Sequence, residues 1–192
     1  MTNPARLPKT IELEGGAALI RRLEADDKPS LLAFARATPA HDLLFMPRDI
    51  TQEKVVDAWI RSEAAGSVAT ILAVAGEDGA LLGCAGLFRD PLSWSPHLGE
   101  LRVLVSPDSR AKGLGRALIQ EAFSIAVLGG LEKITAQMTV DQKGAIAIFE
   151  ELGFRGEALL KDHVRDRAGD AHDIVILSCD VERAASRKSA YA

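Results

Sequence analysis

The chain has 192 residues, of which 47% are hydrophobic and 26% are charged, and its formal net charge is -4. This composition is typical of a globular protein with room for one sizeable core. The small negative net charge provides no global attraction to nucleic acid or to acidic membranes, so neither is an expected partner.

The N-terminal segment and the cysteines bear on location. The first ten residues, MTNPARLPKT, lack the apolar run of a signal peptide, and no segment approaches the ~18 uninterrupted apolar residues of a membrane span. Cys84 and Cys179 lie in apolar stretches, and their spacing matches no zinc or redox motif. Free buried thiols and a cytoplasmic protein are therefore expected.

Segments with strand and helix periodicity alternate along the chain. In chain order, the predicted strands are 17–23, 67–75, 80–88, 97–105, 131–138, 158–165 and 172–179. The predicted helices are 29–38, one beginning at 49–52, 115–128 and 142–152. Glu77-Asp78-Gly79 predicts a hairpin turn between the second and third strands.

This order predicts a single α/β domain over residues 15–181, because no repeat and no linker interrupts it. Its sheet should be mixed, since hairpins supply antiparallel pairs and strand-helix-strand units supply parallel ones. Residues 1–14 are polar and contain prolines, which predicts a flexible N-terminal arm. Residues 182–192 are small and polar, which predicts a flexible C-terminal tail.

The segment from Glu100 to Leu118 places a glycine-bearing loop between a strand and a helix. The first amides of such a helix have no intrahelical acceptor, and the helix dipole adds partial positive charge. Arg110, Lys112 and Arg116 add full charges, while glycines at 113 and 115 let an anion approach the backbone. Together these features predict a diphosphate cradle.

Three other interpretations compete for this segment. It could be an ordinary glycine turn followed by a helix with basic surface residues. A Rossmann fingerprint would need a third glycine where Leu118 stands, and a P-loop would need Gly-Lys-Ser/Thr after four intervening residues. Dinucleotide binding is therefore weakly supported, and the P-loop signature is absent.

Two motifs carry a resemblance to a known family. Arg110-x-x-Gly113-x-Gly115, after a strand ending in Val105-Ser106-Pro107, resembles the acetyl-CoA-binding motif of the GCN5-related N-acetyltransferases (the GNAT superfamily). The segment from Asp141 to Phe154 is similar to the family's later helix and its Leu-Gly-Phe ending. The resemblance covers roughly residues 17–179 and implies a GNAT-like fold, a mixed twisted sheet flanked by helices.

The resemblance also implies a reaction and a set of binding residues. Acetyl-CoA would be the co-substrate, with no metal, and an amine would attack the acetyl carbonyl directly. The strands beginning near Leu98 and Leu131 would splay apart to admit the thioester, and backbone groups of Val103 and Val105 would pair with the pantetheine arm. The implied cofactor-binding residues are Val103, Leu104, Val105, Arg110, Ala111, Lys112, Gly113, Leu114, Gly115, Arg116, Gln142 and Phe149.

The attacking amine must lose a proton, and Glu100 is the best candidate base because it lies on the strand beside the expected thioester. It is in phase with Arg102 and out of phase with Val103. A strand-edge carboxylate paired with Arg102 is an equally weighted alternative, and His97 is the second candidate base.

Two positions depart from the family pattern. Phe149 stands where the family often has a tyrosine that protonates the thiolate, and Gln142 stands where an asparagine is common. The only tyrosine, Tyr191, lies in the predicted tail. The missing tyrosine leaves open an alternative function, a catalytically idle acetyl-CoA-binding sensor; a flavodoxin-like regulatory domain is disfavoured by the consecutive hairpin strands.

The segment from Asp162 to Asp173 is rich in metal-ligand side chains, but its alternating charges favour a solvated hairpin tip. In the family, the corresponding hairpin borders the acceptor pocket or packs on a second subunit, so the resemblance allows a homodimer. The acceptor is expected to be a small-molecule or peptide amine, and the sequence does not choose among a protein N-terminus, a lysine, a polyamine and an antibiotic.

Overall fold

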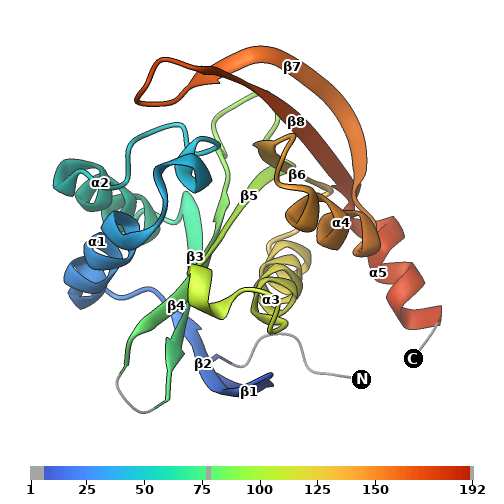
Figure 1. The fold of residues 1–192 in the computed structure, drawn as a ribbon. Coiled ribbons are helices and arrows are strands. Elements are labelled where there is room, and N and C mark those ends of the chain that lie inside the picture. Colours follow the sequence, from blue (N-terminus) through green and yellow to red (C-terminus); the bar gives the residue numbers. More distant parts are fainter. Residues whose placement is uncertain (1–6, 77–78, 191–192) are drawn as a thin grey trace.

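The computed structural model describes residues 7–76 and 79–190, which form one eight-stranded sheet with helices on both faces (Figure 1). The strand order across the sheet is β1-β2-β3-β4-β5-β6-β8-β7. The strands are β1 (Lys9–Leu13), β2 (Gly16–Arg22), β3 (Val68–Ala75), β4 (Leu81–Phe88), β5 (Leu98–Val105), β6 (Lys133–Thr139), β7 (Arg155–Arg165) and β8 (Ala171–Asp180). The predicted mixed α/β fold is confirmed.

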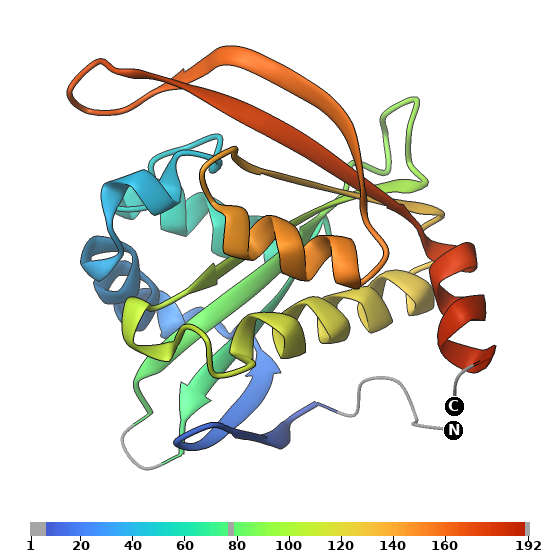
Figure 2. The ribbon, with the colours of Figure 1, turned by 45° about the vertical axis from the view of Figure 1, so that its right-hand side comes forward.

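The described residues also form five α-helices and three short 3-10 turns, and all of them except α5 lie between strands. The helices are α1 (Lys28–Ala37), α2 (Glu53–Ala64), α3 (Leu114–Leu128), α4 (Lys143–Glu151) and α5 (Val181–Ala190). The 3-10 turns are η1 (Ala25–Asp27), η2 (Ala40–Leu43) and η3 (Pro107–Ser109). Helices α1 and α2 lie on one face of the sheet, and α3 and α4 lie on the other (Figure 2). None of the described helices is long and apolar enough to cross a membrane.

The two faces of the sheet bury separate apolar clusters. The cluster under α3 and α4 includes Leu101, Leu118 and Ile134. The cluster under α1 and α2 includes Leu104 and Trp59. Successive side chains of a strand point to opposite faces, so β5 contributes its odd-numbered residues to the first cluster and Leu104 to the second. The two-residue alternation predicted for this strand is confirmed.

Strands β5 and β6 form the one parallel pair among the described strands. A parallel neighbour requires a crossover connection, and α3 supplies it. Helix α4 leads to β7, but β7 does not lie beside β6, because β8 returns antiparallel between the two. The last hairpin therefore places its second strand inside the sheet and its first strand at the edge.

Both ends of the chain carry more structure than the sequence predicts. Residues 9–13, expected within a loose arm, form β1 because their backbone pairs with β2 along the whole strand. Residues 181–190, expected largely within a frayed tail, form α5, whose first turn is capped where Asp180 Oδ1 accepts the Arg183 amide at 2.7 Å. Tyr191 and the turn residues Glu77 and Asp78 lie outside the described residues.

The second helix begins later than predicted, at Glu53. Asp49 accepts hydrogen bonds from the Thr51 amide at 3.0 Å and from its hydroxyl at 2.6 Å, which forms a turn in place of the first helical residues. The connection between α1 and α2 is thus an irregular segment. Its position, described next, matters for the site.

Candidate active site

Strands β5 and β6 separate along their length and form a fork. They pair at three positions, and the last pair joins Glu100 to Thr135. Beyond that pair, residues 136–139 of β6 continue to pair with β8, while β5 continues to pair only with β4. Glu100 and Thr135 therefore mark the point at which the fork opens.

The backbone of β5 presents polar groups to the gap of the fork. The Ser106 amide donates to the Leu82 carbonyl of β4 at 2.9 Å, so the residues that alternate with Ser106 face β4. The intervening residues, which include Val103 and Val105, turn their N–H and C=O groups toward the gap. An extended ligand lying there could pair with β5 as an added strand.

The loop before α3 has the shape of an anion cradle. Ala111 has a φ of 58° and Gly113 a φ of 86°, so two nearby residues adopt the left-handed conformation. Such turns converge successive amides on one point. The first helical hydrogen bond runs from the Ala117 amide to the Gly113 carbonyl at 3.1 Å, which leaves the amides of 114–116 without a helical acceptor.

The two glycines of the loop have different roles. A Cβ at Gly113 would meet nothing within 4 Å, so it is the positive φ that requires glycine there. A Cβ at Gly115 would meet only the Val105 side chain, at 3.7 Å. The open space over both residues is what a bound diphosphate needs.

The basic residues of the cradle differ in their engagement. The Arg110 guanidinium donates to Asp42 at 2.6 Å and to the Val105 carbonyl at 3.4 Å, and Arg116 forms an ion pair with Glu151. The ammonium group of Lys112 is exposed and has no ion-pair partner among the described residues.

A cavity of about 580 Å³ extends from this cradle along the gap of the fork. It brings together most of the residues that the sequence singled out for the cofactor, from three separate segments of the chain. Those that line it are Val103, Leu104, Val105, Arg110, Ala111, Gly115, Gln142 and Phe149. Leu114 is 1% exposed, so only its backbone is available to a ligand.

Gln142 and Phe149 enter this cavity from α4. Gln142 occupies the N-cap position of the helix. Phe149 is 5% exposed, and its ring meets that of Phe154 edge-on at a centroid distance of 4.9 Å. The position expected to face the departing sulfur is therefore a buried aromatic ring without a hydroxyl.

On the other face of the sheet, a cleft of about 520 Å³ opens at the apex of the fork. Glu100, Arg102 and Thr135 point into it from the sheet, and Trp59 and Phe88 form an apolar wall. The Glu100 carboxylate accepts two hydrogen bonds from Arg102, at 2.8 Å and 3.0 Å. The guanidinium also lies 4.0 Å from the centroid of the Phe88 ring, which holds it in place.

The two candidate bases are not brought together. Glu100 lies in the cleft, whereas His97 is exposed, and it lines neither cavity. Trp94, on the neighbouring loop, is fully exposed and is also outside the lining of the cleft. The backbone of His97 has a structural role, because its carbonyl accepts the Glu132 amide at 2.9 Å where β6 begins.

The sequence analysis missed a segment that closes the open end of the fork. Within η2, Asp42 accepts a hydrogen bond from Arg110, which lies in the loop after β5. His41 Nε2 lies 2.7 Å from Oδ2 of Asp141, which lies in the turn after β6. Burial would raise the pKa of Asp141, but hydrogen bonds from Thr139, its own backbone and His41 outweigh it and lower that pKa. No motif marks these residues, since each partner is far away in sequence.

The β7-β8 hairpin arches over this segment, as the views in Figures 1 and 2 both show. The rings of His41 and His172 meet edge-on at 5.1 Å, and Arg167 lies 3.9 Å from Asp49. His172 Nε2 is 3.1 Å from Asp166 Oδ2, and this contact lowers the pKa of Asp166. Among the described residues, no group of three or more His, Cys, Asp or Glu side chains is placed to hold a metal.

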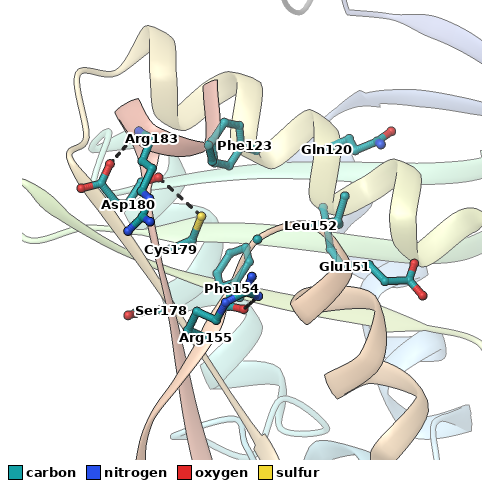
Figure 3. Close-up of a pocket in the computed structure, with 13 residues that line it drawn as sticks. Gln120, Phe123, Glu151, Leu152, Phe154, Arg155, Ser178, Cys179, Asp180 and Arg183 are labelled. Carbon is teal, nitrogen blue, oxygen red and sulfur yellow. Dashed lines mark hydrogen bonds between the residues drawn. The ribbon is translucent and has the colours of Figure 1, made fainter. Parts of the chain in front are cut away.

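A third cavity, of about 680 Å³, lies between α3, the start of β7 and α5 (Figure 3). Phe123, Phe154 and Cys179 line its apolar part, and Arg155 and Arg183 stand at its polar part. It contains neither the cradle nor the apex of the fork. The site of interest is therefore the fork, with the cleft at its apex and the cavity that extends from the cradle.

Comparison with known proteins agrees with this geometry. Residues 40–154 match the model of the Acetyltransferase (GNAT) family. The uncharacterized N-acetyltransferase MJ1207 of Methanocaldococcus jannaschii is 35% identical over 63 residues, which cover 33% of this chain and 28% of that protein. N-acetyltransferase family 8 member 3 of Rattus norvegicus is 25% identical over 114 residues, which cover 59% of this chain and 45% of that protein. The chain thus spans less than half the length of these two relatives.

Solved structures share the whole fold. One is yncA of Salmonella typhimurium, described as an acetyltransferase and solved with its cofactor acetyl-CoA. Its TM-score is 0.71 at 19% identity, with 85% of this chain and 94% of that chain covered. The region that matches the family model contains the cradle and the fork and ends just before β7. The chain belongs to the acetyltransferase (GNAT) family.

Proposed function

We propose that the protein is an acetyl-CoA-dependent N-acetyltransferase that transfers the acetyl group to a primary amine by direct attack. The observation that carries the proposal is the fork between β5 and β6: its apex at Glu100 and Thr135 lines a cleft, and β5 residues 103–105 beyond the apex line a second cavity. One cavity begins at an anion cradle, and the other is a cleft with an ionisable side chain at its end. Two substrates entering from opposite faces could meet there.

The chain's own residues fit acetyl-CoA. Amides of 111–116, Lys112 and Arg110 would hold the diphosphate, and the gap-facing backbone of Val103 and Val105 would pair with the pantetheine amides. Bound acetyl-CoA supplies an acyl carbon activated as a thioester. The open space beside Gly113 and Gly115 supports this fit, because a side chain at either position would extend into the space that the anion needs.

Glu100 is the proposed base. A carboxylate offers about four lone-pair sites, and the two hydrogen bonds from the Arg102 guanidinium occupy two of them. The remaining sites can accept a proton from the ammonium form of the acceptor, directly or through water. The ion pair keeps the carboxylate oriented in the cleft.

The proposed step balances as follows. The neutral amine nitrogen bonds to the acetyl carbon, the carbon–sulfur bond breaks, and the sulfur leaves with the electron pair. One amine proton passes to Glu100 or to water, and the thiolate leaves without an acid, since a thiol of pKa about 8.5 is a tolerable leaving group. Phe149 excludes water from that region.

A covalent acyl-cysteine route is disfavoured. Cys84 lies on β4 opposite Leu104, but burial raises the pKa of its thiol to about 12. A thiol of such high pKa provides almost no thiolate at neutral pH, and the thiolate is the nucleophilic form.

The test is a mass-spectrometric screen of an amine panel with acetyl-CoA, in which each product and the released thiol are measured together. Stoichiometric amide and thiol would support the proposal. Tight acetyl-CoA binding with no product from any amine would instead favour the sensor function, for which Phe149 in place of a tyrosine is the supporting observation.

A further inference from the structure

The charged side chains of the acceptor cleft do not balance. Its lining includes the three guanidinium groups of Arg48, Arg89 and Arg102 and the two carboxylates of Asp90 and Glu100. Two oppositely charged residues, Glu100 and Arg102, neutralise each other through their paired hydrogen bonds. The remaining lining therefore carries two positive charges and one negative charge.

Arg48 is the group in the lining without a partner. Its guanidinium forms no hydrogen bond or ion pair with any of the residues that the structure describes. Arg89 is only partly engaged, because its Nε donates to the Gly66 carbonyl at 3.3 Å. Asp90 closes its own turn by accepting the Leu92 amide at 3.0 Å. The donors left over in this cleft are thus those of Arg48 and Arg89.

The wall that Trp59 and Phe88 form in the same cleft is apolar. The Trp59 indole N–H donates to the Thr70 hydroxyl at 2.9 Å, so its polar atom is already satisfied within the core. A Cβ at position 86 would lie 2.7 Å from the Phe88 ring. Glycine is therefore required at this position of β4 for the rings of Trp59 and Phe88 to pack as they do. The cleft therefore offers an apolar surface with a cationic rim.

We propose that the acceptor is a primary amine that also carries a carboxylate, as an amino acid with an apolar side chain does. The carboxylate would bind Arg48 and Arg89, the apolar carbons would lie against Trp59 and Phe88, and the amine would face Glu100. This inference rests on the proposed function and makes it more specific. A polyamine or an aminoglycoside fits poorly, because additional ammonium groups would meet two guanidinium groups and a single uncommitted carboxylate.

The experiment compares matched acceptors with the intact protein. L-leucine, L-leucinamide, 3-methylbutylamine and spermidine are offered as acceptors, and kcat/KM is expressed per unprotonated amine, so that differences in amine basicity cancel. We expect leucine to exceed leucinamide and 3-methylbutylamine by about tenfold or more, in the range of a charge-assisted hydrogen bond. Equal or better use of the uncharged analogues or of spermidine would overturn the inference while leaving the acetyltransferase function intact.

Variants of the two arginines test whether they cause the preference for leucine. Arg48→Gln and the double variant Arg48→Gln/Arg89→Gln should raise KM for leucine by about tenfold while changing KM for 3-methylbutylamine little. Arg61→Gln is the control, because Arg61 is an exposed arginine on α2 outside the lining of the cleft. A leucine preference that survives in the double variant would contradict the assigned residues.

A binding measurement separates the two claims. With coenzyme A present, calorimetry should show that N-acetyl-leucine binds about tenfold more tightly than N-acetyl-leucinamide, and that Arg48→Gln removes the difference. If that result is obtained but no amine is acetylated, the anion site stands and the transferase function fails. If neither product analogue shows a preference, the anion site fails.

Discussion

The guanidinium of Arg110 donates a hydrogen bond of 2.6 Å to the carboxylate of Asp42, across 68 residues of sequence. The bond joins the loop before α3 to η2. The same 3-10 turn also contacts Asp141, in the turn after β6, through His41. Arg110 is therefore committed to a protein carboxylate at the place where a diphosphate is expected. A bound diphosphate would compete with Asp42 for this guanidinium.

This competition gives the first prediction. Asp42→Asn should tighten acetyl-CoA binding by about two- to fivefold, because Arg110 no longer has to leave an anionic partner. Calorimetric titration measures it. Asp108→Asn is the control, since Asp108 is exposed in the same loop and has no ion-pair partner among the described residues. Weaker binding in Asp42→Asn would mean that Asp42 orients Arg110 for the ligand.

The second prediction concerns the left-handed turn of the cradle. Gly113→Ala should cost about 1 kcal/mol of stability and reduce acetyl-CoA affinity at least about fivefold, because a Cβ disfavours the φ of 86° on which the turn depends. Gly130, with a φ of 68° at the other end of α3, provides the control. Gly130→Ala should lower stability similarly and leave affinity unchanged. Equal loss of affinity in both variants would mean that the effect comes from the helix as a whole.

The third prediction tests the base. Glu100→Gln should lower kcat by about 10²- to 10⁴-fold with unchanged acetyl-CoA affinity, because the amide cannot accept the amine proton. His97→Gln should behave as the parent, since His97 does not line the cleft. If the two variants exchange these behaviours, the base is His97.

The fourth prediction concerns Phe149. Phe149→Tyr should leave the rate unchanged or raise it a few-fold, because it adds a hydroxyl near the departing sulfur while keeping the ring shape. Phe154→Tyr is the control, as Phe154 packs on Phe149 but does not line the cofactor cavity. It should destabilise the fold by about 1–3 kcal/mol through a buried hydroxyl without raising the rate. Large loss of transfer in Phe149→Tyr, with fold and affinity intact, would count against a position beside the thiolate.

The fifth prediction is a stability change with pH at the start of α1. Hydrogen bonds from Arg21, at 2.7 Å and 2.5 Å, lower the pKa of Asp27. A carboxyl group whose pKa is lowered in the folded state stabilises the fold at pH values above its ordinary, unfolded-state pKa. This stabilisation is lost as pH falls through the lower pKa of the folded state. Asp27→Asn should therefore cost about 1–2 kcal/mol at pH 7 and progressively less below about pH 4, as measured by urea unfolding. The exposed neighbour variant Asp26→Asn should show no such dependence.

Much of the molecule follows from neighbours along the chain. The boundaries predicted for α3, β4 and β5 agree with the structure to within one residue at each end. The two-residue alternation of β5 separated Glu100 from Val103, and the glycines at 113 and 115 predicted the turn that precedes α3. Periodicity, helix ends and turn glycines depend on contacts within a few residues, and a sequence displays these directly.

Tertiary structure alone decided where strands pair and what closes the site. Nothing local predicts that β8 lies between β6 and β7, that the pairing of β5 with β6 ends at Glu100 and Thr135, or that residues 9–13 join the sheet. His41 contacts Asp141, 100 residues away, and Asp42 contacts Arg110, 68 residues away. No sequence pattern predicts contacts between segments so far apart. Pairing of distant segments depends on which apolar faces can be buried together, and only the folded chain determines that.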